Sequence, residues 1–99
     1  MDHKGYEIVE IARKSGKIKK GTNEVTKLLE RGTAKAVIYA ADVNPKEIVM
    51  HLPLLAKEKG ILCIEVPSKE ELGAAAGLTK PTAAVVVVDA GDAANMIKE

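Results

Sequence analysis

Residues 34–41 read AKAVIYAA, and this run decides the fold class. Two further apolar runs follow it, at residues 61–66 (ILCIEV) and residues 83–88 (AAVVVV). Each run has the length of a strand, and each lacks the apolar–polar alternation of a strand with one face in water. Strands that are apolar on both sides need helices on both faces of their sheet. The runs therefore predict an α/β fold, a three-layer α/β/α sandwich.

Amphipathic segments alternate with these strands. Apolar residues at helical spacing predict helices at about residues 2–15, 21–31, 46–59, 69–76 and 92–98, with a short basic edge strand at residues 17–20. Asn44 and Pro45 are expected to begin the third helix, and Pro53 to kink it or start a new turn. Ser68 and Glu71 have the spacing of a capping box for the fourth helix. Residues 1–99 are thus expected to form one domain around a mixed sheet of roughly four strands.

The composition narrows the class of function. The chain has no Phe or Trp and only two tyrosines, so it cannot stack a series of single-stranded bases on aromatic side chains. Its one cysteine, Cys63, excludes an internal disulfide and a multi-cysteine zinc site, and we expect it to pack in the core. No apolar run approaches the roughly 18 residues of a membrane span, and the N-terminus has no signal-peptide core. A cytoplasmic protein without membrane contact is expected.

Signals for catalysis are weak. The two histidines, His3 and His51, lie far along the chain from any candidate nucleophile. Glu70 and Glu71 are adjacent, so a helix would separate them by about 100°, which suits a solvated surface and capping rather than a paired acid site. The sequence contains no glycine-rich phosphate loop. We therefore expect no enzyme, no cofactor, no metal site and no small-molecule substrate.

Positive charge is concentrated in the first third of the chain. Residues 1–35 hold nine Lys and Arg against five acidic residues, whereas the remainder holds six against nine, although the whole chain has a net charge of only +1. A basic region of this kind suits an anionic partner. A solvated charged surface would have the same composition, so charge alone leaves both interpretations open.

Within this region, residues 19–27 read KKGTNEVTK and contain the start of the second helix. A helical wheel places Val25, Leu28 and Leu29 on one face. Thr22 or Asn23 is expected to cap the first free N–H groups, and the positive end of the helix favours a nearby phosphate. The polar residues share the opposite, outward face: Asn23, Glu24, Lys27 and Arg31.

This polar face has the chemistry to bind guanine. Lysine can donate to O6 and N7 of guanine, and glutamate can accept from its N1 and N2 donors when the base is not in a standard pair. Asparagine can do either. The combination of Asn23, Glu24 and Lys27 therefore suits unusual, guanine-rich pairs, although similar sets also occur on solvated helices.

The surrounding sequence favours the binding interpretation. Residues 19–61, KKGTNEVTKLLERGTAKAVIYAADVNPKEIVMHLPLLAKEKGI, and residues 66–78, VPSKEELGAAAGL, resemble the L-seven-Ae/L-thirty-e superfamily of kink-turn RNA-binding ribosomal proteins. The resemblance extends from about residue 7 to residue 91 and is strongest to the archaeal L-seven-Ae branch. It rests on GTNEVTK, ERG-AK, DV-P-EI, HLPLL and ELG-AAG, which occur in the family's order and spacing. It implies an α/β/α sandwich without enzymatic activity.

The resemblance also implies roles for individual residues. In the family, the helix start enters the widened major groove of a sharply bent RNA beside tandem sheared G·A pairs. Asn23, Glu24 and Lys27 would contact guanines, and Gly21 and Thr22 would allow close backbone approach. The remaining expected RNA-binding residues are Lys20, Arg31 and Lys69 at phosphates, and a loop over the flipped-out nucleotide that contains Leu78, Thr79, Lys80 and Pro81.

The loop at residues 78–82 departs from the archaeal pattern. Its hydroxyl-basic-proline sequence is similar to that of eukaryotic small-nuclear-ribonucleoprotein relatives, in which this loop restricts the RNAs bound. The resemblance implies a monomer whose partners are a kink-turn RNA and ribosomal or ribonucleoprotein proteins. The RNA could be ribosomal RNA, a box C/D or H/ACA guide RNA or RNase P RNA. The alternative is mainly a protein-docking subunit that uses the third helix and this loop.

Overall fold

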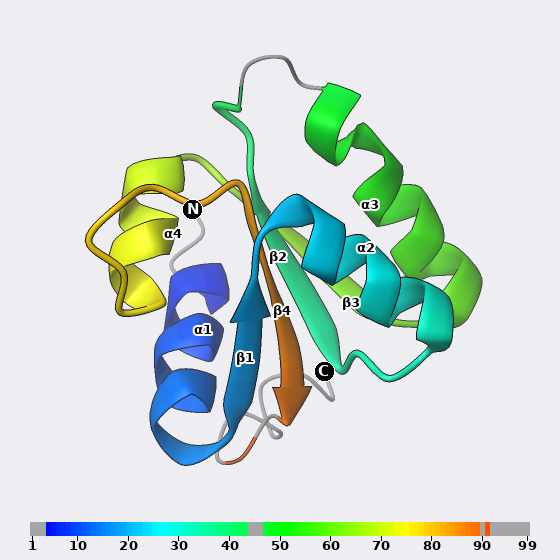
Figure 1. Ribbon diagram of the computed structural model, residues 1–99, viewed down its shortest axis with the longest axis horizontal. Coiled ribbons are helices and arrows are strands. Elements are labelled where there is room, and N and C mark those ends of the chain that lie inside the picture. The colour runs from blue at the N-terminus through cyan, green and yellow to red at the C-terminus, as the bar shows by residue number, and fades with distance from the viewer. Residues whose placement is uncertain (1–3, 44–46, 90, 92–99) are drawn as a thin grey trace.

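The computed structural model describes residues 4–43, 47–89 and 91. The expected helix at residues 92–98 and the expected helix start at Asn44 and Pro45 lie outside these residues. The described residues form four helices and a four-stranded sheet (Figure 1). In chain order the elements are α1 (Lys4–Ser15), β1 (Lys17–Lys20), α2 (Thr22–Arg31), β2 (Ala36–Ala40), α3 (Glu47–Lys59), β3 (Leu62–Val66), α4 (Lys69–Ala75) and β4 (Ala84–Asp89).

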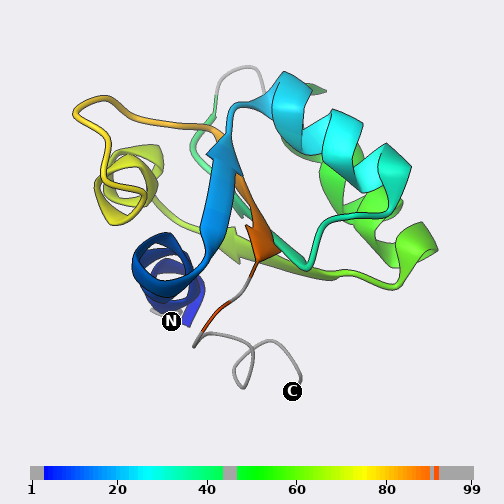
Figure 2. The same ribbon diagram turned by 60° about the horizontal axis from the view of Figure 1, so that its bottom comes forward.

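The sheet is mixed and has helices on both faces, as the apolar runs predict. Its strand order is β1-β4-β2-β3. β2 runs parallel to β3, and β4 runs antiparallel to both β2 and β1. α1 and α4 pack together on one face, and α2 and α3 on the other (Figures 1 and 2). This arrangement confirms the three-layer sandwich.

The two central strands supply much of the core. Ile38 in β2 and Val85, Val86 and Val87 in β4 are fully buried. Because both faces of these strands meet helices, consecutive residues along them are apolar up to the exposed Asp89 at the end of β4, which explains the absence of alternation. Aliphatic side chains therefore build most of the core, with Tyr6 as its one buried aromatic residue among those described.

The expectation of a buried strand at residues 61–66 is wrong in one respect. β3 lies at the edge of the sheet, where it pairs only with β2. Leu62, Cys63 and Ile64 are half-buried, and Glu65 is exposed. An edge strand has a neighbour on one side only, so its side chains remain partly open even when they are apolar.

The structure can be compared with two expectations about helices, the cap of α4 at Ser68 and the break in α3 at Pro53. The Ser68 side chain accepts a hydrogen bond from the Glu71 backbone N–H at 3.1 Å, which confirms the cap of α4. α3 contains Pro53 in its interior and continues through it to Lys59. In the part of the chain that the structure describes, no helix has the length and apolar character to cross a bilayer.

Candidate nucleic-acid interface

α2 begins differently from expectation. Gly21, rather than Thr22 or Asn23, is the N-cap, with φ 96° and ψ 139°, and no side chain of the described residues caps the helix. That backbone conformation is one that glycine adopts and other residues rarely do. The Gly21 N–H donates to the Ala84 carbonyl at 3.1 Å, which fixes the helix start against β4. The first N–H groups of α2 are thus left for a ligand rather than covered by a cap.

The faces of α2 follow the helical wheel except that Leu28, expected on the buried face, is half-buried. Val25 and Leu29 are fully buried against the rest of the core. Asn23, Lys27 and Arg31 are exposed on the opposite side, and Glu24 is half-buried. α2 therefore presents its polar side chains outward while its aliphatic side chains anchor it.

A groove runs between the start of α2 and the loop at residues 78–82. It consists of two adjoining hollows, each of about 470 Å³, which share Lys20 and Leu78. We call the two hollows together the α2 groove. The first hollow is also lined by Ile18, Lys19, Glu24 and Ala76, and the second by Gly21, Thr79, Lys80, Pro81 and Thr82.

The α2 groove brings together most of the residues predicted from the sequence. Lys20 and Gly21 precede α2, and Glu24 lies in its first turn. The loop residues come much later in the chain, between α4 and β4. β1 and β4 are neighbours in the sheet, so the residues after β1 and those before β4 lie at the same end of the molecule (Figure 1). Three lysines, Lys19, Lys20 and Lys80, line the groove and favour an anionic ligand.

Five other predicted residues lie outside the lining of the groove: Thr22, Asn23, Lys27, Arg31 and Lys69. Lys69 begins α4, and its carbonyl accepts from the Thr82 N–H at 3.2 Å, so it adjoins the loop. Lys27 lies about one turn into α2. Arg31 ends α2, which places it roughly 13 Å along the helix axis from Thr22 at 1.5 Å per residue. Lys27 and Arg31 extend the exposed face of α2 away from the groove.

Sequence reasoning missed two residues that support the loop. Gly73 is buried inside α4, and a methyl group there would overlap the Lys80 carbonyl oxygen. Its own carbonyl accepts from the Leu78 N–H at 2.9 Å. Thr82 is buried, and its hydroxyl donates to the Ala84 carbonyl at 3.2 Å. A glycine in a helix interior is a signal of close backbone approach, but Thr82 has no comparable signal.

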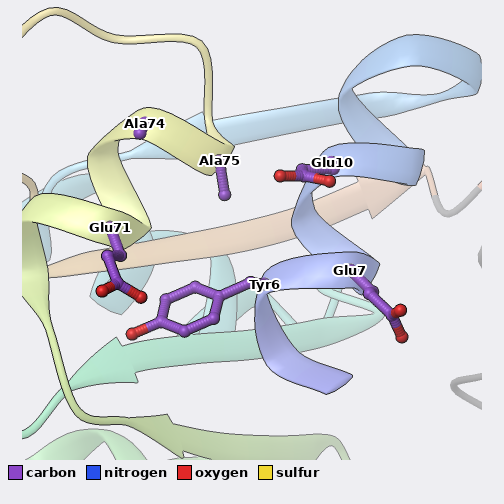
Figure 3. A pocket seen from close by; sticks show the side chains of 6 residues that line it. All are labelled: Tyr6, Glu7, Glu10, Glu71, Ala74 and Ala75. Atoms are coloured by element: carbon purple, nitrogen blue, oxygen red, sulfur yellow. The ribbon is translucent and has the colours of Figure 1, made fainter. Parts of the chain in front are cut away.

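A separate hollow of about 460 Å³ lies between α1 and α4 (Figure 3). Three carboxylates line it, from Glu7, Glu10 and Glu71, together with Tyr6. The Tyr6 hydroxyl accepts from the Ser68 N–H at 3.0 Å, and burial raises the pKa of this phenol above its ordinary value of 10.0. This acidic lining disfavours phosphate, so the α2 groove is the better candidate for an anionic ligand.

The fold and the groove define a small α/β/α protein that presents an uncapped helix start beside a lysine-containing loop. Residues 3–97 match the model of the Ribosomal protein L7Ae/L30e/S12e/Gadd45 family, and the chain belongs to that family. Among solved structures it is similar to the Giardia lamblia 15.5kD RNA binding protein, with 33% identity and a TM-score of 0.80. That match covers 98% of this chain and 82% of the Giardia chain. Both findings confirm the family that the sequence motifs indicate.

Proposed function

We propose that this protein binds RNA through the α2 groove and recognises kink-turn motifs. Membership of a ribosomal protein family supports RNA binding, as does the similarity to a protein described as RNA-binding. The observation that carries the proposal is the start of α2, which no side chain of the described residues caps and which faces the loop at residues 78–82 across the groove. An enzymatic role is not proposed.

Base contacts from α2 would give sequence and shape specificity. The half-buried Glu24 carboxylate accepts from the N1 and N2 donors of a guanine whose Watson–Crick edge is free, as in sheared G·A pairs. Lys27 donates to O6 and N7 of a guanine, and the Asn23 amide can donate or accept a hydrogen bond. Gly21 has no atom within 4 Å of the position of a side chain, so a base or sugar can approach its backbone closely.

Phosphate contacts would set the affinity and its dependence on salt. Lys20 and Lys69 flank the groove, and Arg31 lies further along α2. Leu78 and Pro81 in the loop offer an apolar surface on which an unstacked nucleotide can rest. The protein would then stabilise the kinked RNA conformer by binding it more tightly than the extended one. Candidate targets are ribosomal RNA, box C/D and H/ACA guide RNAs and RNase P RNA.

A gel shift tests this function. One RNA carries a kink-turn, and a matched copy has its G·A pairs replaced by Watson–Crick pairs. We expect tight binding to the first RNA and weak, strongly salt-sensitive binding to the second. Equally weak binding to both would show that the polar face of α2 is only a solvated surface.

A second candidate function is docking of another protein on α3. Met50 and Leu54 are 60% and 68% exposed, and their spacing of four residues places them on one face of the helix. Replacing both by serine should then weaken binding of a ribonucleoprotein protein and leave RNA affinity unchanged. Substitutions of Glu24 and Lys27 should have the reverse effect.

A further inference from the structure

A hydrogen bond joins α2 to α3 behind the α2 groove. Thr26 Oγ1 lies 2.7 Å from His51 Nε2, and both side chains are half-buried. The same Thr26 hydroxyl donates to the Thr22 carbonyl at 2.8 Å. Thr22 is the first residue of α2 and directly follows Gly21. His51 on α3 is therefore connected through Thr26 to the turn that opens the groove.

The directions of the two hydrogen bonds are linked, because a threonine hydroxyl has one proton. When the Thr26 hydroxyl donates to the Thr22 carbonyl, it accepts from a proton on His51 Nε2; in the other tautomer of His51 it donates to Nε2 instead. We assign the Nε2-protonated tautomer, in which the order of donors is His51 to Thr26 to Thr22. His51 acts through Thr26 and does not itself line the groove.

The other contacts that orient α2 are mostly apolar. Val25 and Leu29 hold the helix by apolar packing, which is not directional. The Gly21 N–H to the Ala84 carbonyl fixes one point at the helix start. The Thr26–His51 hydrogen bond is a second directional contact, one turn further along the helix. It restricts rotation of the first turn of α2 about the hydrogen bond at Gly21. Base recognition needs its side chains held within about 0.5 Å of the productive position.

We propose that His51 is a positioning residue for RNA recognition, which holds the first turn of α2 so that Asn23 and Glu24 meet the bases. This inference rests on the proposed function. It assigns His51 a role in binding although no atom of His51 need touch the RNA. Loss of its donor should therefore reduce affinity even in protein that remains folded.

Paired substitutions at the two residues test this role. His51→Leu removes the donor, whereas His51→Gln keeps an N–H of similar reach; Thr26→Val removes the hydroxyl, whereas Thr26→Ser keeps it. We expect Kd for a kink-turn RNA to rise about three- to tenfold in the Leu and Val variants, as for the loss of one hydrogen bond. The Gln and Ser variants should stay within about twofold of the wild type. The Leu/Val double variant should bind no more weakly than the weaker single variant.

Binding is measured at a temperature at which thermal unfolding shows every variant folded. Unchanged affinity in His51→Leu, or equal losses in His51→Leu and His51→Gln, would overturn the positioning role. If His51→Leu does not fold, the Thr26→Val and Thr26→Ser pair decides by the same criterion. A wild type that does not prefer the kink-turn RNA over its Watson–Crick copy overturns the proposed function, and the positioning role with it. A wild type that discriminates, together with unaffected variants, overturns the positioning role alone.

Discussion

Glu24 and Lys27 are the two side chains whose loss should affect RNA binding most directly. We expect Glu24→Ala and Lys27→Ala each to weaken kink-turn binding by about 1–3 kcal/mol, the range for a good base contact. Lys27 is exposed, so its substitution should change the free energy of unfolding by no more than about 0.5 kcal/mol. Binding titrations beside chemical unfolding curves measure both quantities.

Matched controls exist for both charges. Glu30 and Lys14 are exposed and do not line the α2 groove, so Glu30→Ala and Lys14→Ala change the net charge equally without removing a base contact. Their affinities should stay close to that of the wild type. If the controls lose as much affinity as the Glu24 and Lys27 variants, binding depends on overall charge and the assignment of base contacts is wrong.

The thiol of Cys63 should react slowly. Burial, with a smaller contribution from the charge of Glu65, raises its pKa from 9.0 to about 11. Only the thiolate is nucleophilic, and at pH 8 a pKa of 11 leaves about one thiol in a thousand ionised, against about one in ten at a pKa of 9. The rate of alkylation by iodoacetamide should thus keep rising about tenfold per pH unit from pH 8 to pH 10.

Glutathione and the urea-unfolded protein serve as references for this measurement. Both should approach their maximum rates near pH 9–10, because their thiols are in water. A folded-state rate at Cys63 that levels off with them would contradict a half-buried, neutral thiol. The expected slow reaction agrees with a packing role for this residue.

At the scale of elements, the contact between α4 and the loop at residues 78–82 depends on Gly73. Helix propensity alone would make Gly73→Ala stabilising by about 1 kcal/mol. The added methyl group would, however, overlap the Lys80 carbonyl, and it would lie 3.1 Å from the Pro81 Cα. Because backbone atoms cannot move aside as a flexible side chain can, we expect net destabilisation of about 1–3 kcal/mol and weaker RNA binding.

Thermal unfolding and RNA titration of Gly73→Ala measure the two effects, and Ala74→Gly is the control. Ala74 is the next residue of α4, and its side chain is exposed. Its replacement should cost about 1 kcal/mol in stability through helix propensity and leave RNA affinity unchanged. A Gly73→Ala protein that is more stable than the wild type and binds RNA normally would show that the loop does not need this close approach.

The elements also show what a sequence can and cannot predict here. Runs of apolar residues predict β2 and β4, because both faces of a central strand meet helices. A similar run does not distinguish an edge strand from a central one, which is why β3 is more open than expected. The preference of Thr and Asn for helix caps predicts Thr22 or Asn23, but the N-cap is Gly21, one residue before Thr22 and two before Asn23.

The candidate site was predictable to a similar extent. The wheel of α2 separates its buried from its exposed side chains, because helical periodicity is a local property. The loop at residues 78–82 was placed beside α2 only by resemblance, since the strand order that brings them together is a property of the whole sheet. The hydrogen bond between Thr26 and His51 joins residues 25 positions apart, and no local sequence pattern predicts it.

At the scale of the whole molecule, a net charge of +1 gives little general attraction to RNA, so affinity should depend on where the charges lie. Each phosphate contact contributes about 0.7–0.9 to the slope of log K against log salt concentration. Because Lys20 lines the groove, we expect Lys20→Ala to reduce this slope by about that amount. Lys57→Ala, at an exposed position in the last turn of α3, should leave it unchanged. Titrations at several salt concentrations give the slopes, and equal reductions in both variants would mean that RNA responds to total charge rather than to the groove.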